Sequence, residues 1–141
     1  MYTHILVPID LSMKDSLQHA IHVAADLARH YGARLTLVSV TGGIQPKVTH
    51  STEHYEELLA EFAREIEAAE EGVKIGTRVY DVPDPSVQVD SVLVRAVDEI
   101  DADLVVIGSH RPGWVEYLID SHGGRIASHA PVSVFVVREA D

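Results

Sequence analysis

The sequence contains no cysteine. A disulfide framework and a thiolate metal site are therefore both excluded. The sequence also lacks an apolar run near the roughly 18 residues that a membrane-spanning helix needs. Its first residues, MYTHILVPID, lack the basic and then apolar layout of a secretory signal peptide. From these absences we expect a soluble, cytoplasmic protein.

Basic residues are scarce. Eleven lysines and arginines stand against 22 aspartates and glutamates, which gives a formal charge of -11. Because such a chain repels phosphate backbones and anionic lipids, we expect no nucleic-acid or membrane role. Much of the acid lies in residues 51–72, STEHYEELLAEFAREIEAAEEG, and occupies the solvent face of a predicted helix. The apolar face of that helix comprises Tyr55, Leu58, Leu59, Phe62, Ile66 and Ala69.

Short β-branched runs alternate with longer segments of helical periodicity, in a chain of 141 residues that fits one domain over 1–141. This alternation predicts a doubly wound α/β fold with a parallel sheet. The predicted strands are residues 3–9, 33–40, 74–82, 103–109 and 132–137. We expect 103–109, which is continuously apolar, to be central and 74–82, which mixes polar residues, to lie at an edge.

The predicted helices fill the intervals between these strands. The first stops at Gly32, the second follows a long loop and begins near Thr52, the third opens at PDPS, and a short fourth ends at HAP. The apolar face of the first is Leu17, Ala20, Ile21, Ala24, Ala28 and Tyr31, and that of the third is Val89, Val92, Leu93, Ala96, Val97 and Ile100.

In doubly wound sheets, ligands bind beyond the carboxyl ends of the strands, where the strand order reverses. Two loops therefore come under consideration. One is PIDLS, residues 8–12, after the first strand, and the other is GSHRPGWVEYLIDSHGG, residues 108–124, after the fourth. The second loop is rich in glycine, histidine and short polar residues, as an anion-binding loop would be.

Three segments carry a resemblance to the universal stress protein family: ILVPIDLS at the start, DADLVVIGSHRP in the middle and RIASHAPVSVFVVRE at the end. The resemblance covers nearly the whole chain. It implies the three-layer, adenine nucleotide alpha hydrolase-like fold with five parallel strands in the order 3-2-1-4-5. It also implies a stress-response role, a homodimer that pairs the last strands of two subunits and, as in many members, an ATP site.

The nucleotide-binding branch of that family resembles glycine, two residues, glycine, nine residues, glycine, then serine or threonine. Gly108 matches the first glycine and Ser121 the final hydroxyl residue, but Arg111 and Asp120 replace the other two glycines and the interval is one residue shorter. The resemblance implies that the phosphates would be surrounded by Gly108, Ser109, His110, Arg111, Ser121, His122 and Gly123.

Asp120 and Arg111 act in opposite directions on a bound phosphate. A carboxylate within about 4 Å of a phosphate is repelled by about 1 kcal/mol even in water, whereas a guanidinium binds phosphate oxygens in pairs. Ser121 suits the N-cap of the last helix, which would present free main-chain N–H groups. We therefore expect ATP, with magnesium, to bind more weakly than in members that keep the glycines. The alternative is a dimeric interaction protein whose nucleotide site has decayed.

The resemblance also places Pro8, Asp10 and a main-chain group near Val38 beside the adenine ring. All three residues are present, so adenine recognition looks more intact than triphosphate recognition. A purely structural account stays open, in which Asp10 caps the following helix and Pro8 ends a strand.

The other groups of potentially reactive residues lead us to assign neither a metal site nor a catalytic residue. His50 and His54 have the i, i+4 spacing of a zinc pair but lack the HExxH order, so we assign no metal site. There is no G-x-S-x-G elbow and no identifiable general base, so we assign no catalytic residue and regard slow ATP hydrolysis as a minor possibility.

Two apolar features remain, the aromatic residues of the loop and the last strand. Trp114 and Tyr117 are expected to pack against the body of the domain. The run VSVFVV predicts an apolar edge strand that dimerises through Val134, Phe135, Val136 and Val137.

Overall fold

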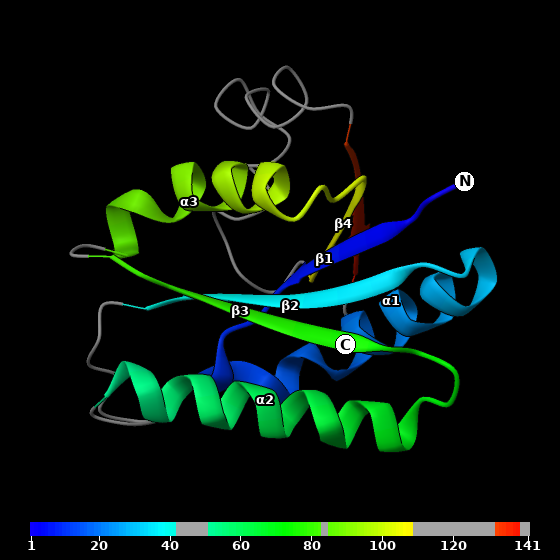
Figure 1. Ribbon diagram of the computed structural model, residues 1–141, viewed down its shortest axis with the longest axis horizontal. Helices are drawn as coiled ribbons and strands as arrows, with labels where there is room; N and C mark the ends of the chain where they lie inside the picture. Colours follow the sequence, from blue (N-terminus) through cyan, green and yellow to red (C-terminus); the bar gives the residue numbers. More distant parts are fainter. Residues whose placement is uncertain (42–50, 83–84, 109–131, 139–141) are drawn as a thin grey trace.

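The computed structural model describes residues 1–41, 51–82, 85–108 and 132–138. Five parallel strands form one sheet in the order β3-β2-β1-β4-β5 (Figure 1). This order confirms the doubly wound class predicted from the sequence pattern and the strand order that the family resemblance implies. The strands are β1 (His4–Pro8), β2 (Arg34–Thr41), β3 (Ile75–Asp81), β4 (Leu104–Gly108) and β5 (Ser133–Val137).

The strand order reverses between β1 and β4. The β1–β2 register continues to the pair Pro8 and Val38, whereas the β1–β4 register stops at Leu6 and Val105. Proline has no N–H to donate to a ladder, so Pro8 contributes no donor at the point where β1 ends. The two central strands are thus paired at their amino ends, and their pairing stops before their carboxyl ends are reached.

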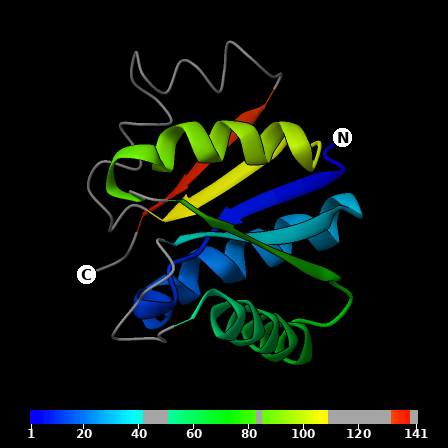
Figure 2. The ribbon, with the colours of Figure 1, turned by 60° about the vertical axis from the view of Figure 1, so that its left-hand side comes forward.

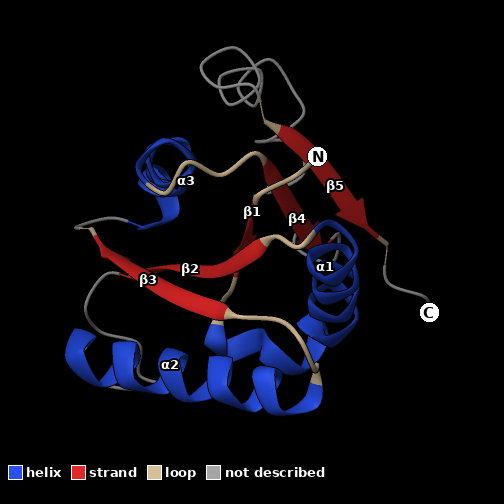
Figure 3. Ribbon diagram, turned by 45° about the vertical axis from the view of Figure 1, so that its right-hand side comes forward, coloured by secondary structure: helices blue, strands red, loops and turns tan. Residues whose placement is uncertain are grey.

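Helices cover both faces of the sheet (Figures 2 and 3). The short 3-10 helix η1 (Leu11–Leu17), α1 (Gln18–Tyr31) and α2 (Thr52–Ala69) pack on one face, and α3 (Pro85–Glu99) packs on the other. Alternate residues of β1 point to opposite faces of the sheet. Ile5 and Val7 pack with α1 and α2, whereas Leu6 packs with α3. Right-handed crossovers require this change of face when the strand order reverses.

The predicted helical faces are largely confirmed. Tyr55, Leu59, Phe62 and Ile66 of α2 are buried, while Leu58 is half-buried and Ala69 is exposed. The stop at Gly32 is also confirmed, because Gly32 adopts φ 66° and the Ala33 N–H donates to the Ala28 carbonyl at 2.9 Å. A left-handed residue of this kind ends a helix, and glycine adopts it without steric strain. The 3-10 helix η1 was not anticipated as a separate element.

The burial of the strands matches their places in the sheet. Every residue of β4 is buried, whereas β3, at one edge, has buried, half-buried and exposed residues in turn. β5 forms the other edge, where Phe135 is 43% exposed and Val137 is buried. The predictions of a central fourth strand and an edge third strand are therefore confirmed.

Polar side chains close the amino ends of the strands. Asp103, just before β4, accepts hydrogen bonds from the main-chain N–H groups of Thr3 at 2.9 Å and His4 at 3.1 Å. Burial alone would raise the pKa of Asp103, but these hydrogen bonds outweigh it and lower the pKa. The buried His4 contacts Thr36 Oγ1 through Nε2 at 2.6 Å. Its pKa is lowered by burial and by the nearby Arg34. We call His4, Thr36, Thr3 and Asp103 the amino-end cluster.

None of the helices in the described ranges has the length and apolar character needed to cross a lipid bilayer.

Candidate functional site

The carboxyl ends of β1, β2 and β4 lie at one edge of the sheet, beside the reversal of strand order. Pro8 is the last residue of β1 and is paired with Val38 of β2. The Ile9 N–H then donates to the Val38 carbonyl at 2.8 Å, which carries the β1–β2 association one residue beyond the strand. Gly108 ends β4. The structure therefore places Pro8 and Gly108 at the carboxyl ends of the two strands that flank the reversal, where ligands of this fold class bind. Val38 lies beside Pro8, within β2, which continues to Thr41.

Asp10 directs the chain away from β1. It has extended backbone angles, φ -115° and ψ 114°, and is the N-cap of η1. Its Oδ1 accepts hydrogen bonds from the main-chain N–H of Ser12 at 2.9 Å and from Ser12 Oγ at 2.7 Å. Asp10 thus caps η1, as the structural interpretation of this residue expects. Contact between Asp10 and an adenine ring stays a prediction.

A chain of buried hydrogen bonds supports the loop that carries Asp10. The Leu11 N–H donates to Tyr55 Oη at 3.2 Å, and Tyr55 Oη donates to Ser39 Oγ at 3.3 Å. Ser39 Oγ in turn donates to the Ile9 carbonyl at 2.5 Å. We call Ile9, Leu11, Ser39 and Tyr55 the carboxyl-end relay. It ties the loop on both sides of Asp10 to β2 and to α2.

The relay is deeply buried, which makes each of its hydrogen bonds consequential. Tyr55 is 1% exposed and Ser39 is fully buried. A buried donor or acceptor left without a partner costs about 1–3 kcal/mol. The relay therefore holds the main chain of residues 9–11 in one position.

The relay was not predicted from the sequence. The helical spacing places Tyr55 on the apolar face of α2 but does not show what its hydroxyl binds, and Ser39 lies within an apolar strand. The available signal was chemical, because a tyrosine on a buried helix face needs a partner for its hydroxyl, and a serine in an apolar strand offers one. The partner Leu11 lies 44 residues away from Tyr55, so no local pattern connects them.

The predicted phosphate residues lie outside the described residues. These are Ser109, His110, Arg111, Ser121, His122 and Gly123, together with Asp120. His50, Trp114 and Tyr117 also lie outside them. Within the described ranges, no group of three or more histidine, aspartate or glutamate side chains is arranged to hold a metal ion.

The comparisons with known proteins agree with the fold. The family model for the universal stress protein family matches residues 1–138. The universal stress protein G of Salmonella typhimurium is 26% identical over 149 residues, covering 98% of this chain and 100% of that protein.

Solved structures give the same result. A universal stress protein in complex with cAMP superposes with a TM-score of 0.65 at 20% identity, covering 99% of this chain and 98% of that one. The universal stress protein from Archaeoglobus fulgidus in complex with dAMP superposes with a TM-score of 0.62 at 22% identity, covering 96% and 97%. At these identities the likeness shows the shared fold.

Proposed function

This chain belongs to the universal stress protein family, and we propose that it binds an adenine nucleotide where β1 and β4 end. The observation that carries the proposal is that Pro8, paired with Val38, and Gly108 end the two strands on either side of the strand reversal. Two proteins of the same fold hold cAMP and dAMP, and adenine is common to both ligands. Their complexes support an adenine nucleotide as the ligand class.

The adenine half of the proposed site rests on a rigid main chain. The Ile9–Val38 hydrogen bond and the carboxyl-end relay fix residues 8–11 from both sides. A preformed edge loses little conformational entropy on binding, so a modest set of contacts with the purine ring suffices for affinity. Pro8 and Asp10 would lie beside the ring, with a main-chain group near Val38 at its edge.

For the phosphates we propose ATP, with magnesium, held by the loop that follows Gly108. The sequence supports this half less strongly, since Asp120 introduces a negative charge and Arg111 a positive one. Repulsion by Asp120 predicts that a nucleotide with fewer phosphates loses less affinity than ATP does. The second candidate, a nucleotide-free interaction protein of the same fold, is favoured by the same replacement of glycine by Asp120.

We also propose that the protein is a cytoplasmic homodimer that acts in the stress response by changing its partners. β5 pairs with β4 on one side, and an apolar edge strand is a template for pairing with another chain. The exposed ring of Phe135 supports association through Val134, Phe135, Val136 and Val137. Sedimentation of the purified protein should give a dimer, and Phe135→Glu should shift it to monomer, because a carboxylate would be buried at the interface.

The nucleotide proposal is tested by what the purified protein carries and by calorimetry. We expect adenine nucleotide in the supernatant after denaturation, and measurable affinity for AMP and ATP once the protein has been stripped. Asp120→Gly should raise ATP affinity about fivefold or more and AMP affinity less, since it removes a charge near the outer phosphates. If the stripped protein binds neither nucleotide at millimolar concentration, the interaction-protein alternative holds.

A further inference from the structure

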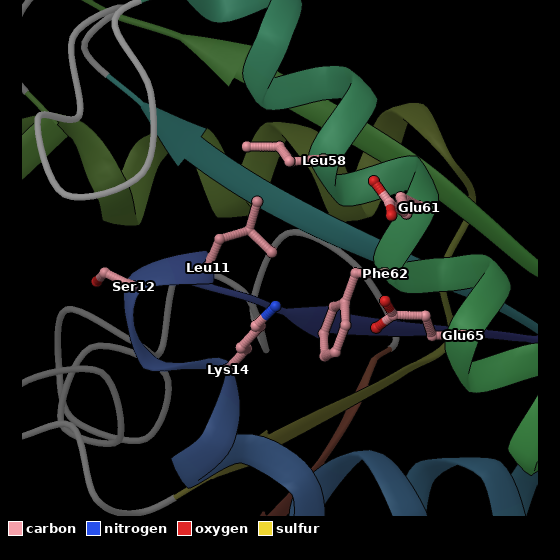
Figure 4. A pocket seen from close by; sticks show the side chains of 7 residues that line it. All are labelled: Leu11, Ser12, Lys14, Leu58, Glu61, Phe62 and Glu65. Atoms are coloured by element: carbon pink, nitrogen blue, oxygen red, sulfur yellow. The ribbon is translucent and has the colours of Figure 1, made fainter.

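A groove runs between α2 and the segment formed by η1 and α1. It consists of two adjoining pockets of about 370 and about 330 Å³, and Phe62 and Glu65 line both. We call it the α1–α2 groove. Figure 4 shows the larger pocket, in which Lys14 reaches from η1 toward Phe62 while Glu61 and Glu65 lie on the α2 side.

The walls of the groove combine an apolar base with acidic edges. Leu58 and Phe62 contribute apolar surface to the larger pocket, and Ile21 and Ile66 contribute it to the smaller one. This combination suits a ligand that presents apolar side chains flanked by positive charge.

Two carboxylates of the groove have no cationic partner. Glu61 and Glu65 are exposed, and within the described part of the chain neither forms an ion pair or a hydrogen bond. They stand four residues apart on α2, where like charges repel each other. Glu70, at the far end of the groove, differs because His22 and Arg29 already pair with it at 2.5 and 3.0 Å. Among the carboxylates that line the groove, those without a cationic partner therefore flank Phe62.

Lys14 shows which chemistry the larger pocket accepts. Its ammonium nitrogen lies 5.7 Å from the centroid of the Phe62 ring, within range of a cation–π interaction. Lys14 is exposed, and an exposed side chain of this length can move aside. A lysine or arginine from another molecule could then make the same contact between Glu61 and Glu65.

We propose that the α1–α2 groove docks a basic amphipathic helix of a partner protein. From Leu58 to Ala69 the groove follows α2 for about 16 Å, at roughly 1.5 Å per residue, which is the length of about three helical turns. Apolar anchors of a docked helix, spaced i, i+4 and i+7, would enter the two pockets. Its lysines would meet Glu61 and Glu65, and the charge of -11 would favour the approach of a basic partner over an acidic one.

The test uses a fluorescein-labelled synthetic 16-residue helix, with leucine at i, i+4 and i+7 and lysine beside each leucine. The reference peptide has glutamate in place of every lysine. Fluorescence anisotropy with the full-length protein should show saturable binding of the basic peptide alone. The double variant E61K/E65K should weaken binding about tenfold or more, because two attractive contacts become repulsive.

The matched control is E53K/E57K, since Glu53 and Glu57 are exposed, are also four residues apart on α2 and do not line either pocket. E53K/E57K changes the net charge by the same amount as E61K/E65K and should leave the affinity for the basic peptide within about twofold of that of the natural protein. Equal weakening by the two double variants would show that only the total charge matters and would overturn the proposal. Absence of peptide binding at low salt would overturn it as well. If E61K/E65K does not fold by circular dichroism, E61Q/E65Q against E53Q/E57Q makes the same comparison.

Discussion

The two ends of the central strands are both held by polar side chains, but with different chemistry. The amino-end cluster contains a carboxylate, Asp103, and a buried imidazole, His4. The carboxyl-end relay is made of hydroxyls and main-chain groups, which carry no charge near pH 7. The amino end therefore closes the sheet with a carboxylate and an imidazole, whereas the carboxyl end fixes a loop with hydroxyls and main-chain groups.

Because of this difference, substitutions at the two ends should affect stability and the proposed site differently. Changes at the amino-end cluster should alter the free energy of unfolding without moving residues 8–11. Changes in the relay should alter both, because the relay supports the loop that carries Asp10. Four measurements can break or sharpen this contrast.

The largest effect is expected from Asp103→Asn. The substitution keeps the shape but removes the charge that accepts from the Thr3 and His4 N–H groups, so stability should fall by about 2 kcal/mol in urea unfolding. Nucleotide affinity should not change. Asp101→Asn is the control, since Asp101 is exposed and asparagine tolerates its positive φ of 55°. Equal losses of stability in the two variants would show that the hydrogen bonds of the Asp103 carboxylate contribute nothing beyond the loss of a negative charge.

Tyr55→Phe should have the next largest effect on stability, about 1–2 kcal/mol, because the buried Leu11 N–H loses its acceptor. It should also weaken AMP binding several-fold in calorimetry, through loosening of residues 9–11. Tyr31→Phe is the matched control, because the Tyr31 hydroxyl has no hydrogen-bond partner among the described residues. Unchanged AMP affinity in Tyr55→Phe would separate the relay from the site.

His4 should make stability depend on pH. Its pKa is lowered in the folded protein, so the unfolded chain binds the extra proton first. The contribution is fully present above the ordinary value of 6.5 and is lost as pH falls through that value toward the folded pKa. Urea unfolding between pH 7.5 and 5.5 should therefore show a steeper decline for the natural protein than for His4→Gln. An equally steep decline in the two proteins would show that His4 does not contribute to the pH dependence.

The smallest effect is expected from His22, with the opposite sign. Its hydrogen bond to Glu70 raises its pKa, so its contribution is present below 6.5 and is lost as pH rises through the folded pKa. Because His22 is 57% exposed, the effect should be slight and should vanish in about 0.5 M salt. His22→Gln should flatten the slope above pH 6.5 at low salt. If the dependence of stability on pH above 6.5 stayed the same in high salt, the His22–Glu70 pair would not be a surface ion pair that salt screens.

The parts of the fold that follow local patterns were predictable from the sequence. The continuous apolar run of residues 103–109 predicted a central strand, and the helical spacing from Leu17 to Ala28 predicted α1 and its stop at Gly32. The strand order and the positions of Pro8, Asp10 and Val38 in the proposed site depended instead on the resemblance to a known family.

What escaped prediction depends on contacts between distant residues. Asp103 binds Thr3 across 100 positions and Tyr55 binds Leu11 across 44, so neither pair leaves a periodic trace. The helix η1 was missed because its residues, with Met13 at a non-helical φ of -126°, form no regular apolar face. The phosphate residues from Ser109 to Gly123 remain a prediction from the sequence.

The hydrogen bond from the Leu11 amide to Tyr55 gives this protein an internal reporter. An amide at the start of a short helix ordinarily exchanges its proton with solvent quickly, because no earlier turn covers it. Here deuterium can replace that proton only when the contact between the loop and α2 opens. The exchange rate of one amide thus measures how often this contact opens, and a nucleotide that tightens the loop would slow it.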